Sequence, residues 1–182
     1  MYASSSYQVM VLAFKEWAYI VDALGKGRQS IIIRKGGISE EGGDFAIKGK
    51  KFLLLPTQFH QAQEMIKPEW LMSLDGEKYF AEPERVSIEY FAEIAQSMVI
   101  KDWSLLEKLD SQHAWKMGVI KERFERWEKS AHLLIVQVYK LTTPYVLEMS
   151  PEYAGCKSWI ELSQGPEFTG TLVPNQVLKG RF

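Results

Sequence analysis

The stretch "GRQSIIIRKGG", residues 27–37, holds three consecutive isoleucines between polar residues and glycines. So short a run of β-branched residues predicts a buried strand rather than a helix. An arginine and a lysine follow at its end, and the next glycines can leave backbone N–H groups unpaired. A guanidinium fork, a point charge and free amides together suit a phosphate. We therefore predict an anion-facing loop of Arg34, Lys35, Gly36 and Gly37. A glycine turn with charged flanks is the equally supported alternative.

Other strands are predicted on the C-terminal side of this stretch. "KKFLLLPT" at 50–57 is a buried apolar run that ends at a proline. In "AHLLIVQVYKL", residues 131–141, successive side chains of a strand would point to opposite faces. One of these faces is purely apolar and consists of Leu134, Val136 and Val138. "YVLEM" and "SWIEL" are shorter candidates, and residues 85–100 are compatible with either a strand or a helix.

Helical spacing of apolar residues predicts a helix over 7–24, and shorter helices at 102–110 and 114–130. Asp102 is a suitable N-cap for the second of these. Short strands spread along the chain with helices between them predict an α+β fold. The sheet is expected to be mixed and curved, or closed into a small β-barrel, with flanking helices.

The chain has 182 residues, which suits a single domain over 1–182, and a helical, acidic insertion would fit at about 63–130. The net charge is −1, but Lys and Arg number 8 against 5 acids in residues 1–51, 5 against 11 in 60–110 and 6 against 3 in 111–140. A polyanion could use one basic face of such a molecule. Alternating charges on solvated faces are the competing interpretation.

The only cysteine, Cys156, excludes an internal disulfide and predicts a reducing compartment, the cytoplasm. The N-terminal residues lack the pattern of a signal peptide, and the longest apolar stretches are far too short to span a bilayer. We therefore expect a soluble protein with no membrane partner. A nucleophilic role for Cys156 would need a histidine base nearby, and a packing role is the more common one.

Two further segments supply candidate binding residues. "FLLLPTQFHQ", residues 52–61, brings Thr57, His60 and Gln61 directly after a buried strand, where loops commonly carry function. Amide and imidazole groups there could read base edges, although Thr57 could equally be a helix N-cap. "YAGCKSW", residues 153–159, adds the cation Lys157 beside a flexible glycine.

No pair of histidines has ligand spacing, so we expect neither a metal nor another cofactor. Scattered carboxylates with a lysine can still hold Mg²⁺, and Asp44, Lys48 and His60 are the candidates for that chemistry.

Three blocks resemble a bacterial domain family of unknown function, numbered 1802. They are "AFKEWAYIVDALGKGRQSIIIRKGGI", "FLLLPTQFHQ" and "YAGCKSWIEL", which lie between residues 13 and 162. The family has no assigned activity, and its association with restriction-endonuclease-type domains implies a role in restriction-modification or defence and a restriction-type protein partner.

A second similarity is to the ASCH and PUA-like nucleic-acid-binding barrels. Their motif has a glycine, a lysine two residues later, a glutamate five later and an arginine seven later. Gly27 and Arg34 match it, whereas Gln29 and Ile32 replace the lysine and the glutamate. This resemblance implies a PUA-like barrel that contacts nucleic acid, without the acidic group of the motif.

Three functions follow as hypotheses. The first is a nucleic-acid-binding module, DNA or RNA, in which Arg34, Lys35 and the glycine loop share a cleft with the other candidates, Thr57, His60, Gln61 and Lys157. The second is a metal-dependent nuclease or nucleotide-processing enzyme. The third is an interaction subunit of a defence system that presents Trp70, Trp103 and Trp127 to a protein partner. We predict the first, and no residue pattern indicates a particular reaction.

Overall fold

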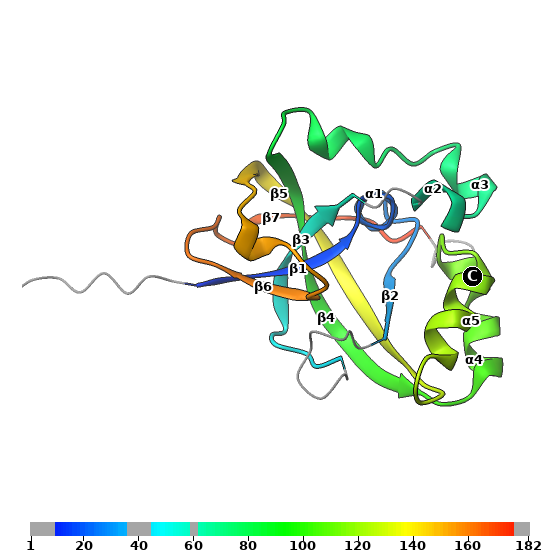
Figure 1. The fold of residues 1–182 in the computed structure, drawn as a ribbon. Coiled ribbons are helices and arrows are strands. Elements are labelled where there is room, and N and C mark those ends of the chain that lie inside the picture. Colours follow the sequence, from blue (N-terminus) through cyan, green and yellow to red (C-terminus); the bar gives the residue numbers. More distant parts are fainter. Residues whose placement is uncertain (1–9, 36–44, 59–61, 177–182) are drawn as a thin grey trace, which may run out of the picture.

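The computed structural model describes residues 10–35, 45–58 and 62–176. Within these residues seven strands form one mixed sheet in the order β2-β5-β4-β3-β1-β6, and β7 pairs with β5 at the side (Figure 1). The strands are β1 Val11–Trp17, β2 Ile31–Arg34, β3 Lys51–Thr57, β4 Arg85–Ile100, β5 Ala131–Glu148, β6 Trp159–Leu162 and β7 Gly170–Leu172. The sheet is not closed into a barrel, so the predicted mixed sheet is confirmed and the barrel is not.

The long antiparallel pair β4–β5 forms the centre of the sheet and crosses the molecule in Figure 1. The ambiguous segment 85–100 is therefore a strand, and its alternating Val86, Ile88 and Tyr90 are buried. The register shifts between Ile88 and Tyr90 and again between Ile94 and Gln96. Such irregularities bend a strand and increase its twist, which accounts for the curvature.

The helix predicted over 7–24 is wrong in its first half. Residues 11–17 form β1, and α1 begins only at Ala18 and ends at Gly25. β1 is paired on both sides, parallel to β3 and antiparallel to β6. Val11 and Ala13 pack into one apolar cluster and Phe14 into the other, on the opposite face. A strand that is apolar on both faces loses the alternation that identifies strands, so its sequence fits helical spacing as well.

The remaining helices are short. They are α2 Ala62–Met65, α3 Pro68–Leu71, α4 Trp103–Lys108 and α5 Met117–Glu125, with 3-10 turns η2 Glu77–Phe80, η3 Asp110–Gln112 and η4 Pro151–Tyr153. The predicted cap of α4 is confirmed, since the Asp102 carboxylate accepts a hydrogen bond of 2.9 Å from the Ser104 backbone N–H. α2 to α5 lie together on one side of the sheet (Figure 1). None of the helices in the described part of the chain is long and apolar enough to cross a membrane.

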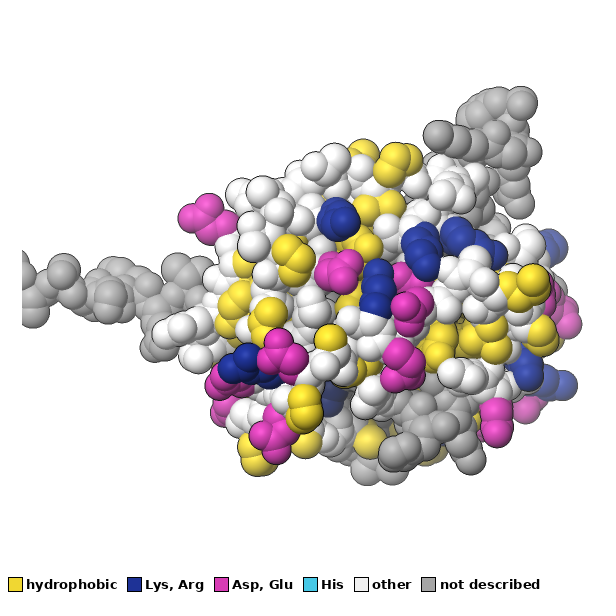
Figure 2. All heavy atoms as spheres, turned by 90° about the horizontal axis from the view of Figure 1, so that it is seen from above, with side chains coloured by type: hydrophobic (Ala, Val, Ile, Leu, Met, Phe, Trp, Pro, Cys, Tyr) yellow, Lys and Arg dark blue, Asp and Glu magenta, His cyan; other side chains and the backbone are white. Residues whose placement is uncertain are grey.

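Charges of opposite sign are interspersed on the face shown in Figure 2, where Lys and Arg side chains lie beside Asp and Glu side chains. Cations and carboxylates from distant segments also pair. Lys78 lies 2.9 Å from the carboxylate of Asp22 and 3.5 Å from that of Glu89, and Lys67 lies 2.7 Å from Asp110. Ion pairs of this kind join segments that are far apart in the chain.

Gly27 connects α1 with the C-terminal segment. Its backbone has a left-handed φ of 66°, and a methyl group there would overlap the carbonyl oxygen of Pro174. The Gly27 carbonyl also accepts a 2.8 Å hydrogen bond from the N–H of Gln176. Gly27→Ala should therefore lower the free energy of unfolding by about 2 kcal/mol, measured by denaturant titration.

Gly155→Ala is the matched control for that substitution. Gly155 has a similar φ of 83°, but nothing lies within 4 Å of the added methyl group. Only the backbone strain remains, which is worth about 1 kcal/mol. Equal losses in the two variants would show that the contact with Pro174 is unimportant.

Candidate functional site

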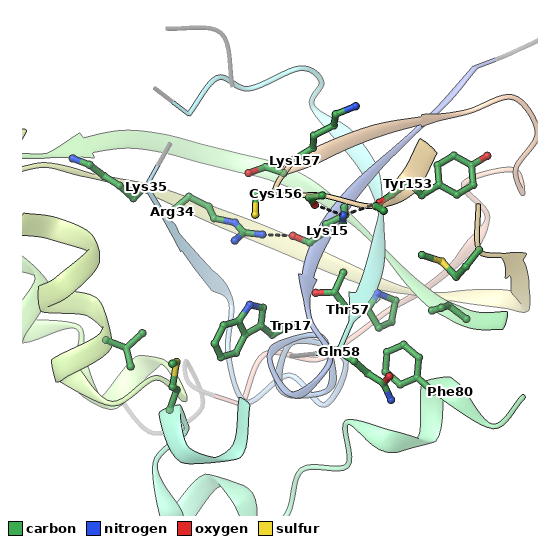
Figure 3. A pocket seen from close by; sticks show the side chains of 18 of the residues that line it. Lys15, Trp17, Arg34, Lys35, Thr57, Gln58, Phe80, Tyr153, Cys156 and Lys157 are labelled. Carbon is green, nitrogen blue, oxygen red and sulfur yellow. Dashed lines mark hydrogen bonds between the residues drawn. The ribbon is translucent and has the colours of Figure 1, made fainter. Parts of the chain in front are cut away.

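A cavity of about 920 Å³ opens where the parallel strands β1 and β3 end (Figure 3). Trp17 and Thr57 are the last residues of these strands, and both line it. The other walls come from the end of β2, from α5, from residues 80–86 and from the loop 153–158. We call this space the β1–β3 cavity. Carboxyl ends of neighbouring parallel strands are common ligand positions in α/β sheets, because side chains from several strands converge there.

Positive charge predominates in the walls of the β1–β3 cavity. Seven cationic residues line it against three acidic ones, a net of +4. The cations are Lys15, Arg34, Lys35, Arg85, Arg123, Arg126 and Lys157, and the acids are Glu82, Glu84 and Glu122. Arg85 and Arg126 pair with Glu82 and Glu122 at 2.7 Å in exposed ion pairs. Arg34 is likewise paired with the buried Glu16 carboxylate at 3.7 Å, so the excess positive charge comes mainly from Lys15, Lys35, Arg123 and Lys157.

Arg34 is largely enclosed by the protein. Its guanidinium donates to the Lys15 carbonyl, lies 3.7 Å from the Glu16 carboxylate and sits 4.7 Å from the centre of the Phe14 ring. The Arg34 side chain is 16% exposed. Contacts inside the protein thus hold Arg34 in place. It contributes positive charge to the cavity wall, but its guanidinium group is not positioned to move toward a ligand.

Lys35 borders the cavity, but its ammonium group is engaged elsewhere. The Nζ atom donates to the Ser130 carbonyl at 3.0 Å, to the Ser130 hydroxyl at 3.2 Å and to the Glu128 carbonyl. Figure 3 shows this side chain well apart from Lys15 and Thr57. Lys35 thereby ties the end of β2 to the turn after α5. Gly36 and Gly37, the rest of the predicted loop, lie outside the described residues.

Thr57 and Lys157 occupy different parts of the same cavity. The Thr57 hydroxyl donates to the Glu16 carbonyl at 3.1 Å and so joins the ends of β1 and β3. Lys157 is exposed at the opposite wall, next to the exposed thiol of Cys156. The fold therefore brings Arg34, Lys35, Thr57 and Lys157 to one cavity. His60 and Gln61 lie outside the described residues.

Lys15 and Trp17 are cavity residues that sequence reasoning missed. Lys15 Nζ donates to the carbonyls of Tyr153 and Gly155 at 2.7 and 2.8 Å and so holds the loop 153–158 over the cavity. Burial, and then the nearby cations Lys157 and Arg34, lower the pKa of Lys15, while Cys156 opposes the shift. The signal that could have identified them is their separation by two positions, because residues 15 and 17 of a strand point to the same side.

Arg123, on α5, is a further cationic residue of the cavity wall. Its guanidinium lies 4.0 Å from the centre of the Trp115 ring and 5.6 Å from that of Trp17, and Nη1 donates to the Ile33 carbonyl at 3.5 Å. Burial lowers the pKa of Arg123 to about 10. Arg123 therefore stays protonated at neutral pH and places a permanent positive charge beside the indole of Trp17.

The structure describes only some of the residues named in the two other hypotheses. Asp44 and His60, proposed for metal chemistry, lie outside the described residues, and Lys48 is exposed and does not line the β1–β3 cavity. The prediction that Trp70 is an exposed anchor is wrong, since it is 7% exposed and covered by the Arg28 guanidinium at 4.5 Å. Trp103 is half-buried, and Trp127 is 55% exposed.

The comparisons with known proteins agree with this fold. The family model described as "Domain of unknown function (DUF1802)" matches residues 13–175. No curated protein matches the chain. A variant of ZmASCH from Zymomonas mobilis, solved as a crystal structure, is similar with a TM-score of 0.51 and 11% identity, over 83% of this chain and 88% of that one.

The crystal structure of ASCH from the same organism gives a TM-score of 0.44 at 10% identity, over 69% of this chain and 65% of that one. The aligned part thus spans just under two thirds of that protein's length. The similarity to the ZmASCH variant shows an ASCH-like fold.

Proposed function

Because the chain belongs to the DUF1802 family and has an ASCH-like fold, we propose that it binds nucleic acid at the β1–β3 cavity. The observation that carries the proposal is the net charge of +4 among the cavity residues, next to the ring of Trp17. Cations attract the phosphate backbone, and an aromatic ring offers a surface for a base. The resemblance to PUA-like nucleic-acid-binding domains supports the same function.

The arrangement suggests separate tasks for the cavity residues. Lys157 is exposed and can contact a phosphate directly. Arg34 and Arg123 are held by internal contacts and supply a fixed positive field. The cavity, at about 920 Å³, is of the size of small-molecule pockets, which favours a few unpaired nucleotides over a duplex.

Lys157→Ala tests the proposal without disturbing the interior. The variant should bind a single-stranded oligonucleotide several-fold more weakly at low salt, because one phosphate contact is lost. The slope of log affinity against log salt should also fall by about one. Fluorescence anisotropy over a series of salt concentrations measures both quantities.

Lys140→Ala is the matched control, because Lys140 is also exposed but does not line the β1–β3 cavity. Its affinity and salt slope should equal those of the wild type. Salt-independent binding by the wild type, or equal effects of the two substitutions, would contradict a phosphate contact in the cavity.

Two narrower assignments remain predictions from the sequence. A connection to DNA restriction or defence, with a restriction-type partner, depends on the family resemblance. Location in the cytoplasm depends on the use of a single cysteine. Co-purification of the tagged protein from its native host would test the partner, and cell fractionation would test the compartment.

A further inference from the structure

Trp127 has an unusual combination of exposure and backbone conformation. It follows α5, its side chain is 55% exposed, and its φ is 58°. A left-handed conformation costs a bulky residue roughly 1–2 kcal/mol, and such outliers are concentrated at functional sites. An exposed indole on a strained backbone therefore indicates a binding surface for a ligand.

The turn that carries Trp127 is held by several hydrogen bonds. The Ser130 N–H donates to the carbonyls of Phe124 and Glu128 at 3.2 and 2.8 Å. Lys35, from the end of β2, donates to the Glu128 carbonyl and to Ser130. These contacts provide the support that keeps the strained conformation in place. They also couple the Trp127 turn to the cavity wall.

The neighbours of Trp127 in the chain belong to two different hollows. Arg126 lines the β1–β3 cavity, where it also pairs with Glu122 at 2.7 Å. Lys129 lines a second hollow of about 470 Å³. We call this the α4–α5 hollow; its walls are Lys101, Asp102, Trp103, Lys121, Phe124, Glu125 and Lys129. Three lysines against two acids give it a net charge of +1. Along the chain Arg126 precedes the indole, and Glu128 and then Lys129 follow it.

We propose that Trp127 is a stacking platform for one unpaired base of a single strand that extends from the β1–β3 cavity toward the α4–α5 hollow. This inference rests on the proposed function and narrows the ligand to single-stranded nucleic acid. Stacking on an exposed indole tolerates any base, because every base has a π face. Cations on both sides of the indole suit the phosphates that flank a stacked base.

A double-mutant cycle between protein and ligand tests this inference. The probe is a single strand of about ten deoxythymidines, which spans the usual site of such a protein, and its abasic derivatives, one for each position. Trp127→Ala should lower affinity for the intact strand about tenfold. Removal of the base at one position should lower the affinity of the wild type by a similar factor. The same removal should not lower the affinity of Trp127→Ala any further. Trp127→Phe should retain most of the affinity.

The controls separate stacking from other effects. Met72→Ala removes another exposed apolar side chain, 91% exposed, and should bind as the wild type does. A duplex of the same length should bind the wild type and Trp127→Ala equally, since its bases are not available for stacking. A uridine strand in place of deoxythymidine gives the same comparison for RNA.

The outcomes distinguish this inference from the proposed function. If the intact strand binds with a salt dependence that Lys157→Ala reduces, but Trp127→Ala has no effect, the stacking platform is wrong and the cavity proposal stands. If the wild type binds no strand at all, both fail. If Trp127→Ala instead abolishes self-association of the protein and leaves strand binding unchanged, the exposed indole is a protein contact and the inference is overturned.

Discussion

Replacing Arg34 by methionine should lower the free energy of unfolding by about 3 kcal/mol, because the Glu16 carboxylate would stay buried without its cationic partner. Glu16 is 1% exposed. One of its oxygens accepts a 2.7 Å hydrogen bond from the Trp17 N–H, and the other lies 3.7 Å from the Arg34 guanidinium. The methionine keeps much of the apolar volume over the Phe14 ring, so the loss reports mainly on charge.

Denaturant titration of three variants measures this effect. Glu16→Gln combined with Arg34→Met removes both charges, and should recover most of the lost stability. Arg85→Met breaks an exposed pair with Glu82 and Glu148, and should cost much less stability than Arg34→Met, because solvent screens that pair. If Arg34→Met and Arg85→Met proved equally mild, Arg34 would not be a buried partner of Glu16.

Stability should fall by about 3 kcal/mol between pH 6.5 and pH 4 because of His113 alone. Burial, followed by repulsion from Lys67, lowers the pKa of this histidine from 6.5 to about 4. The Lys67 ammonium donates to the His113 carbonyl at 3.0 Å, and the imidazole is completely buried. The unfolded chain therefore binds a proton near pH 6.5 that the folded protein does not accept until about pH 4.

The direction of the change in stability with pH follows from this difference between the folded and unfolded pKa of His113. Above pH 6.5 the histidine is neutral in both states and its contribution is fully present. As the pH falls toward 4, protonation of the unfolded chain removes the contribution. His113→Leu should abolish this part of the pH dependence, measured as the difference between the two proteins' unfolding free energies at pH 7 and pH 4. Parallel pH profiles for the wild type and His113→Leu would contradict the prediction.

Local patterns predicted the elements whose two faces differ, or whose ends carry a clear signal. The strand 131–141 has one purely apolar face, and 50–57 is a continuous apolar run, although its strand continues through Pro56 to Thr57. The local pattern of residues 11–17 predicted the wrong element. Both faces of β1 are covered, so its apolar residues fit helical and strand spacing alike. The pairing with β3 and β6, which is non-local, selects the strand.

The candidate site was predicted in part for the same reason. Arg34 and Lys157 were recognised as cations beside strands and glycines, and both line one cavity. Their use as nucleic-acid contacts stays a prediction. Lys15 and Trp17 were missed because the incorrect helix gave them no common direction. The partial burial of Arg34 could not be predicted, since it depends on Glu16 and Phe14 from another strand.

By itself, the sequence determined the α+β class, most of the strands and the cationic end of the isoleucine strand. These depend on side-chain chemistry within a few residues, and local periodicity records it. Three outcomes depended on the folded chain: residues 11–17 form a strand, Arg34 and Arg123 lie near Glu16, and Lys35 supports the turn of Trp127. Those outcomes depend on contacts between residues far apart in the chain, whose balance of burial and charge no local pattern contains.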